Sequence, residues 1–146
     1  MLIMIIRKKD VKMAKVIADT CVWSEVLRRK DPVPDIQEKM QKLIFDLDII
    51  MLGPIRQELL SGLKDETRFK QLASLLSIYT DETILTEDYV QAARFCNICR
   101  SHGIQGSPVD YLICAVAYRL NAYIFTVDKD FEYYAKYISI GLYRPF

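Results

Sequence analysis

The apolar and polar positions of the chain predict short buried strands that alternate with amphipathic helices. Apolar runs bounded by turn residues predict strands at 15–18, 48–52, 78–80, 122–126 and 137–140. Helical spacing of apolar residues predicts helices at 21–29, 35–45, 54–62, 65–77, 86–102 and 107–120, with a last short helix after residue 128. Strands alternating with helices are typical of a parallel sheet covered on both faces. We therefore expect an α/β fold, a three-layer α/β/α sandwich whose central, mostly parallel sheet has about five strands.

Local signals mark several helix ends. Pro54 suits the first turn of a helix and Gly62 suits its left-handed exit. Thr86 is expected to cap the long helix that follows it through its side-chain oxygen. Residues 107–110, Ser-Pro-Val-Asp, form a capping-box pattern at the start of another helix.

Length and composition favour one folded domain. The chain has 146 residues, of which 51% are hydrophobic and 27% charged, which is sufficient for a core and argues against wholesale disorder. We expect a single domain over residues 1–146, with residues 1–12 as a candidate N-terminal extension because Met13 is a second candidate start besides Met1. The net charge of +1 neither indicates nor excludes a nucleic-acid partner, since binding depends on how charge is distributed over the surface.

The N-terminus carries no recognisable export or membrane signal. Its apolar part, residues 1–6, is far shorter than the roughly 20 residues of a membrane-spanning helix. Its basic residues follow the apolar run, whereas a signal peptide places them first. We therefore expect a cytoplasmic protein without membrane attachment, whose cysteines are reduced thiols: Cys21, Cys96, Cys99 and Cys114.

Four acidic residues are predicted to lie at the same edge of the sheet. Asp19 follows the first strand and Asp128 follows the fourth. Glu58 and Asp110 lie on helices that begin near the carboxyl ends of the strands, where functional groups of open α/β sheets collect.

Each acid alone also has a structural explanation. Asp19 can cap the next helix, Asp110 can complete a capping box, Glu58 can be a solvated helix residue, and Asp128 can be a turn residue. Together, however, carboxylates at one edge repel one another unless a cation neutralises them. Carboxylate oxygens suit Mg²⁺ or Mn²⁺, and such ions activate water and stabilise charge on a phosphate under attack. Histidine is not required, and the single one, His102, lies outside these segments.

These segments resemble the PIN-domain ribonucleases, specifically the VapC-type toxins of toxin–antitoxin pairs. The resemblance spans residues 18–131. The matching segments, in the family's order, are "ADTCVW" with Asp19, "IRQELLSG" with Glu58 and Gly62, "SPVDYLICAVA" with Asp110, and "FTVDKDF" with Thr126, Asp128, Asp130 and Phe131. Cys21, where members often have another small or apolar residue, and the segment before Met13 depart from the pattern.

The resemblance implies a Mg²⁺- or Mn²⁺-dependent endoribonuclease that cleaves structured or translation-related RNA. It implies that Asp19, Glu58, Asp110 and Asp128 are the catalytic, metal-holding acids, with Asp130, Thr126 and Thr20 as supporting residues. It also implies a homodimer and a cognate antitoxin that blocks the site. Arg56 is a candidate contact for RNA phosphate. The cations Arg28, Arg29 and Lys30 are further candidates, although helix-end cations favoured by the helix dipole explain them equally well.

Other functions stay open at the level of the sequence. A PIN nuclease could process RNA without an antitoxin, or the fold could serve only for partner binding. A receiver-like phosphotransfer domain would have an acidic pair after the first strand, and a haloacid-dehalogenase-type phosphatase would have Asp-x-Asp there. The sequence Asp19-Thr-Cys at this position matches neither pattern well. The segment "CNICRSH" resembles a partial zinc site that lacks a fourth ligand, and buried helix cysteines explain it better.

Overall fold

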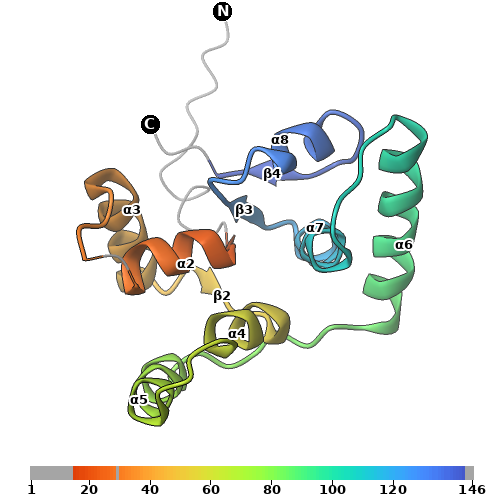
Figure 1. Cartoon of the computed structure of the whole chain (residues 1–146). Helices are drawn as coiled ribbons and strands as arrows, with labels where there is room; N and C mark the ends of the chain where they lie inside the picture. Colours follow the sequence, from red (N-terminus) through yellow and green to blue (C-terminus); the bar gives the residue numbers. More distant parts are fainter. Residues whose placement is uncertain (1–14, 29, 144–146) are drawn as a thin grey trace, which may run out of the picture.

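The fold is a parallel β-sheet with helices on both of its faces (Figure 1). The computed structural model of the chain describes residues 15–28 and 30–143. Candidate starts Met1 and Met13 and the candidate extension over residues 1–12 lie outside this part. The elements follow in the order β1 (Val16–Ala18), α2 (Thr20–Leu27), α3 (Pro34–Phe45), β2 (Ile49–Ile50), α4 (Gly53–Leu60), α5 (Glu66–Leu76), α6 (Thr86–Ser101), α7 (Pro108–Leu120), β3 (Tyr123–Phe125), α8 (Asp130–Ala135) and β4 (Gly141–Leu142).

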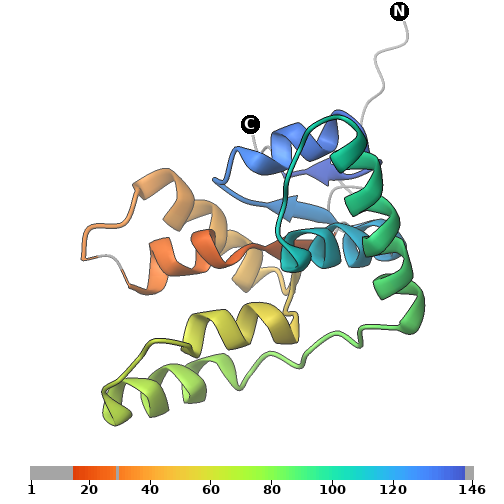
Figure 2. The same ribbon diagram turned by 45° about the vertical axis from the view of Figure 1, so that its right-hand side comes forward.

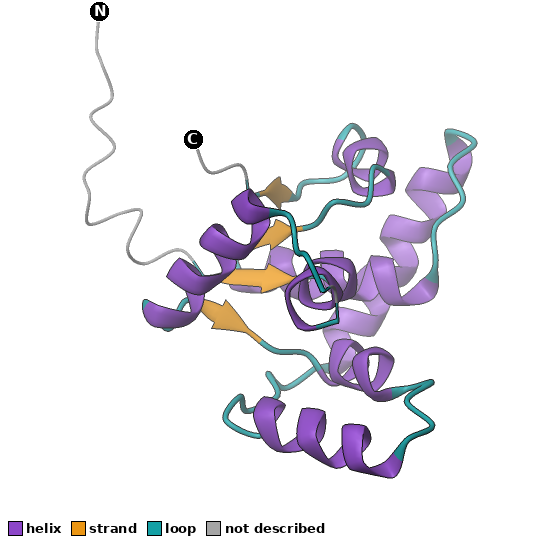
Figure 3. Ribbon diagram, turned by 60° about the vertical axis from the view of Figure 1, so that its left-hand side comes forward, coloured by secondary structure: helices purple, strands orange, loops and turns teal. Residues whose placement is uncertain are grey.

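The sheet of the described residues has four strands in the order β2-β1-β3-β4, and every neighbouring pair is parallel. Val16 lies opposite Ile49 on one side and Tyr123 on the other, so the strands end at the same edge. Helices α2 and α3 lie on one side of the sheet, and α6 and α7 lie on the other (Figures 1 and 3). The predicted α/β sandwich with a parallel sheet is confirmed, with four described strands rather than about five.

Two of the predicted strands were wrong. Instead of a strand at 78–80, the structure has one isolated parallel bridge between Met51 and Asp81. The last strand lies at Gly141–Leu142 and not at 137–140, where Tyr137 and Ile138 continue the turn after α8 through bonds to the Tyr134 carbonyl. A Cβ at position 141 would lie 2.9 Å from the Tyr123 ring, so the close approach of β4 to β3 requires glycine there.

The core extends along α7, which is buried from Tyr111 to Ala117. A helix that is apolar on nearly every side belongs to the interior. Helix α6 lies beside it (Figure 2), and a buried ion pair joins the two, with Arg119 Nε 2.8 Å from an oxygen of Asp88, which is only 1% exposed. Helix α7 is therefore a fixed support for the residues at its first turn.

Helix starts match the sequence signals only in part. Ser107 accepts a hydrogen bond from the Asp110 N–H at 3.1 Å, which confirms the expected cap of α7. The expected Thr86 cap was wrong, because Thr86 is already helical and the Asp88 carboxylate accepts from the Leu85 N–H at 2.8 Å instead. Within the described residues, the helices are too short or too polar to span a bilayer.

Candidate active site

Asp19 lies at the junction of β1 and α2, where both of its sequence interpretations hold. Its side chain accepts from the Thr20 N–H at 2.8 Å and so caps α2. Its own N–H bonds to the Phe125 carbonyl at 2.8 Å, which fixes this carboxylate at the ends of β1 and β3. It is only 7% exposed, a low value for a carboxylate without a positively charged partner nearby in the described part of the chain. Capping explains the backbone geometry but not the burial of a charge.

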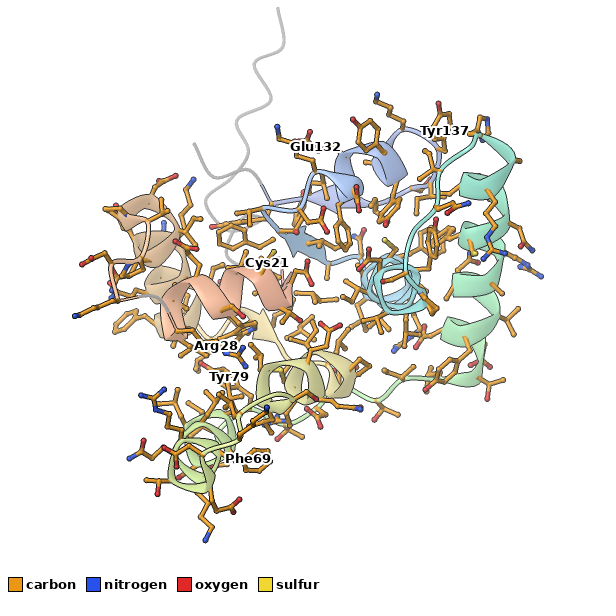
Figure 4. The ribbon with its side chains drawn as sticks, viewed as in Figure 1. Cys21, Arg28, Phe69, Tyr79, Glu132 and Tyr137 are labelled. Carbon is orange, nitrogen blue, oxygen red and sulfur yellow. The ribbon has the colours of Figure 1, made fainter. Side chains whose placement is uncertain are left out.

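Thr126 links Asp19 to Asp128. Its hydroxyl donates to Asp19 Oδ2 at 3.1 Å and accepts from the Asp128 N–H at 3.0 Å. The Cys21 thiol donates to the same Asp19 oxygen at 3.5 Å and lies 3.4 Å from the Thr126 hydroxyl. Figure 4 shows Cys21 at the start of α2. The ends of β1 and β3 are therefore joined through one hydrogen-bonded cluster.

Asp110, Asp128 and Asp130 bring carboxylate oxygens within 4.8 Å of one another. Asp110 is half-buried in the first turn of α7, whereas Asp128 and Asp130 are exposed on the loop that leads into α8. The Asp130 N–H bonds to Asp128 Oδ1 at 2.9 Å, which fixes this short loop. Asp130, which was predicted only as a supporting residue, thus belongs to the group of acids whose oxygens are nearest to one another. Asp19 and Glu58, which were predicted to hold the metal, lie beside that group.

Glu58 reaches the cluster from α4. Its side chain is exposed, and Oε2 accepts a 2.5 Å hydrogen bond from the Thr20 hydroxyl. Because Thr20 directly follows Asp19, this bond holds Glu58 next to the end of β1. All four predicted acids, from four separate segments, therefore lie at the edge of the sheet where β1 and β3 end.

The acids act on one another electrostatically. Burial raises the pKa of Asp19, hydrogen bonds from Thr20, Thr126 and Cys21 lower it, and the charge of Glu58 raises it further. The net pKa of Asp19 is raised above its ordinary value.

Asp110 shows the same balance. Burial raises its pKa most, hydrogen bonds from Tyr134 and Ser107 lower it, and the charges of Asp19 and Asp128 raise it, with a net increase. Hard oxygen donors held together against their repulsion are the donor set that Mg²⁺ or Mn²⁺ binds, so the residues present fit such an ion.

Comparison with known proteins identifies the family. The family model described as PIN domain matches residues 16–137. The chain belongs to the PIN-domain family. None of the curated proteins compared matches this PIN-domain sequence.

Solved structures share its fold. FitAcB from Neisseria gonorrhoeae is 19% identical over 88% of this chain and 96% of its own, with a TM-score of 0.73. FitAB bound to an IR36 DNA fragment is 19% identical over 88% of this chain and 93% of its own, with a TM-score of 0.72. VapBC2 from Rickettsia felis, bound to a DNA fragment from its promoter, is 14% identical over 88% of this chain and 96% of its own, with a TM-score of 0.72.

Two of the cations proposed from sequence, Arg56 and Arg28, have partners within the fold of this PIN domain. Arg56 donates to Asp81 Oδ1 at 2.9 Å and to the carbonyls of Leu76 at 2.8 Å and Tyr79 at 2.5 Å. Arg56 therefore ties α4 to the end of α5 and to the segment that follows it, and these contacts explain its position without an RNA phosphate. Arg28, which follows the last turn of α2, donates to the Leu59 carbonyl of α4 (Figure 4). Lys30 is exposed, and Arg29 lies outside the described residues.

The partial zinc motif is not assembled as a metal site. Among the described residues, the single group of three or more potential ligands is the aspartate group given above. Cys99 is buried in the core, and His102 stacks on Tyr137 with ring centroids 3.9 Å apart, near the end of α6 (Figure 4).

Sequence reasoning missed Tyr134 as a neighbour of the acids. Its hydroxyl donates to Asp110 Oδ2 at 2.8 Å. In the sequence it is one of several aromatic residues in "DFEYYAKY", and nothing there relates it to an acid 24 residues earlier. Only the packing of α8 near the first turn of α7 reveals the contact.

Proposed function

We propose that this PIN-domain protein is a metal-dependent endoribonuclease, a VapC-type toxin that cleaves structured or translation-related RNA. The observation that carries the proposal is the group of carboxylate oxygens within 4.8 Å at Asp110, Asp128 and Asp130, with buried Asp19 joined to it through Thr126. Such a group is unfavourable without a cation and well suited to binding one. Membership of the PIN family and the fold shared with FitAB and VapBC2 support the same proposal.

Asp19, Glu58, Asp110 and Asp128 would hold the ion, with Asp130 as a further ligand or support. When bound, Mg²⁺ or Mn²⁺ lowers the pKa of a coordinated water and neutralises charge on the phosphate under attack. The protein itself would hold these carboxylates in the arrangement that binds the ion.

The hydroxyls of the site fix these carboxylates. Thr126 fixes Asp19 relative to Asp128, and Thr20 holds Glu58 beside them. The ligands that are anchored on strand ends and a buried helix need little rearrangement to bind the ion, which favours catalysis.

Replacing Asp19 by asparagine tests the proposal. Asparagine keeps a side-chain oxygen that can cap α2 but removes the charge. RNA cleavage by the purified protein with Mg²⁺ or Mn²⁺ should largely stop, while the far-UV circular dichroism spectrum is retained. Asp35→Asn, an exposed acid of α3 that pairs with Lys39, is the matched control and should cleave like the wild type. Unchanged cleavage by Asp19→Asn would exclude the metal-holding role of Asp19, and absence of cleavage by the wild type would favour a role in partner binding alone.

The partner proposal is separate. We propose that a cognate antitoxin inhibits this protein, and the FitAcB and VapBC2 complexes named above support such a partner. We further propose that the protein is a cytoplasmic homodimer made of single-domain chains, on the basis of the sequence features and the resemblance given above. A small gene immediately upstream that encodes a DNA-binding protein, and co-purification of its product, would support this. Without such a gene, an RNA-processing PIN nuclease that has no antitoxin is the better proposal. A cleavage map on total cellular RNA would identify the substrate, and light scattering would give the oligomeric state.

A further inference from the structure

Tyr134 makes a buried contact with one of the proposed metal-holding acids. Its side chain comes from α8 and is fully buried, with 0% of its surface exposed. Its hydroxyl donates to Asp110 Oδ2 at 2.8 Å, so a hydrogen bond connects α8 to the first turn of α7. The ring packs on Tyr111, with centroids 5.1 Å apart, and on Phe131, with centroids 5.2 Å apart. The position of the hydroxyl is therefore fixed by aromatic packing on two sides.

Gly106 leaves the space that this hydroxyl occupies. A Cβ at position 106 would lie 2.5 Å from the Tyr134 hydroxyl oxygen and 2.8 Å from the Tyr111 ring. Real Cβ atoms do not approach other atoms so closely, and both rings are buried, so a side chain there would have to displace them. The loop before α7 thus contributes to the contact by having no side chain at this point.

The Asp110 carboxylate lies where the negative charges of neighbouring carboxylates repel it. Its oxygens are within 4.8 Å of those of Asp128 and Asp130, and like charges at this distance repel. Without a restraint, rotation of the Asp110 side chain would relieve the repulsion. A donor on Oδ2 opposes that rotation and still leaves Oδ1 available to a ligand.

We infer that Tyr134 is a positioning residue that holds the Asp110 carboxylate toward Asp128 and Asp130 in readiness for the metal ion. This inference rests on the proposed function. Hydrogen-bond partners of metal ligands commonly change metal affinity by about 10- to 100-fold when they are removed. Tyr134 is expected to belong to this class of residues, and Gly106 to be required for its position.

Tyr134→Phe is the sharpest test, because it removes one oxygen and keeps the ring contacts. We expect Mn²⁺ affinity, measured from the electron paramagnetic resonance signal of free Mn²⁺, to fall by about tenfold or more. Tyr111→Phe is the matched control, since it removes a buried hydroxyl from the same aromatic group without a bond to Asp110. It should bind Mn²⁺ like the wild type. Cleavage by Tyr134→Phe should recover substantially at saturating Mn²⁺.

A double-mutant cycle with Asp110→Asn separates positioning from general loosening. If Tyr134 acts through Asp110, adding Tyr134→Phe to Asp110→Asn should cause little further loss of Mn²⁺ affinity. Gly106→Ala provides a second route, and it should weaken Mn²⁺ binding in the same direction by displacing the hydroxyl.

The outcomes distinguish this inference from the proposed function. If the wild type binds Mn²⁺ and Tyr134→Phe binds it equally well, or if the two substitutions reduce affinity independently, the positioning role is excluded and the proposed function stands. If the wild type does not bind Mn²⁺, the proposed metal-dependent function is overturned, and the positioning role with it.

Discussion

Replacing Asp110 by asparagine tests the balance between charge repulsion and metal binding in the site. Because Asp110, Asp128 and Asp130 have oxygens within 4.8 Å of one another, each pair repels by at least about 0.9 kcal/mol in water-like surroundings and by about 3.5 kcal/mol at an effective dielectric constant of about 20. Asp128 and Asp130 are exposed, so the lower value applies. Removing the charge of Asp110 should relieve about 2 kcal/mol over its pairs with Asp128 and Asp130, and the charge of Asp19 adds to the repulsion that is relieved.

The weakening of one hydrogen bond in Asp110→Asn offsets part of this gain in stability. Tyr134 donates to Asp110 Oδ2 at 2.8 Å, and a bond to a charged acceptor is stronger by about 1 kcal/mol than a bond to the amide oxygen that replaces it. In buffer containing EDTA, Asp110→Asn should therefore be more stable than the wild type by about 1 kcal/mol, which corresponds to an increase of about 3 °C in Tm.

Addition of Mn²⁺ should make the wild type more stable than Asp110→Asn. At a Mn²⁺ concentration about 100 times its Kd, binding stabilises the wild type by about 2.7 kcal/mol, and a variant that lacks one ligand should gain much less. Thermal unfolding followed by circular dichroism, with EDTA and then with Mn²⁺, measures both effects. Asp35→Asn is the control and should follow the wild type in both buffers. A variant that is less stable than the wild type in EDTA would refute the repulsion argument, and equal stabilisation of both proteins by Mn²⁺ would refute Asp110 as a ligand.

The pH dependence of the metal-free proteins follows from the raised pKa of Asp110. Folding favours the protonated form of a group whose pKa it raises, so this contribution to wild-type stability is present at low pH and is lost as pH rises through the folded pKa. Asparagine does not titrate. The advantage of Asp110→Asn in EDTA should therefore be absent below the unfolded pKa of about 3.9 and should grow as pH rises. An advantage that shrinks toward neutral pH would contradict this.

Three further predictions concern individual contacts. Arg119→Met should lower the free energy of unfolding by about 3 kcal/mol in urea titrations, because it leaves the buried Asp88 carboxylate without its charge partner, and a loss under 1 kcal/mol would contradict this. Arg56→Ala should lower stability by about 2 kcal/mol, because its hydrogen bonds to α5 and the following segment are lost, but should leave the KM for RNA unchanged below the Tm. A raised KM with unchanged stability would restore its role as a phosphate contact. Thr126→Val keeps the side-chain volume but removes the hydroxyl that joins Asp19 to its neighbours, so Mn²⁺-dependent cleavage should fall about tenfold or more, and wild-type cleavage would show that this hydroxyl is not needed.

The sequence predicted the helices more accurately than the short strands at the edges of the sheet. Helix α7 was predictable because its apolar residues and the Ser107 cap are local signals. The strand expected at 78–80 is only a single bridge at Asp81, and β4 lies at 141–142 beyond the expected 137–140. A short edge strand forms where a neighbouring strand provides backbone hydrogen-bond partners. The residues of the segment itself do not determine where those partners lie.

The order of strands and helices along the chain was sufficient to predict which acids lie at the edge of the sheet. Asp19 follows a buried strand, and parallel strands must end at one edge, so its position relative to Asp128 follows from the strand pattern. The contacts of these acids, in contrast, became known only from the packing of the elements. The approach of Asp130 to Asp110, the bond from Tyr134 and the structural use of Arg56 all depend on how helices pack, because such contacts join residues that are remote along the chain. Sequence periodicity fixes the face on which a side chain lies, whereas its partner is fixed by the packing of another element against that face.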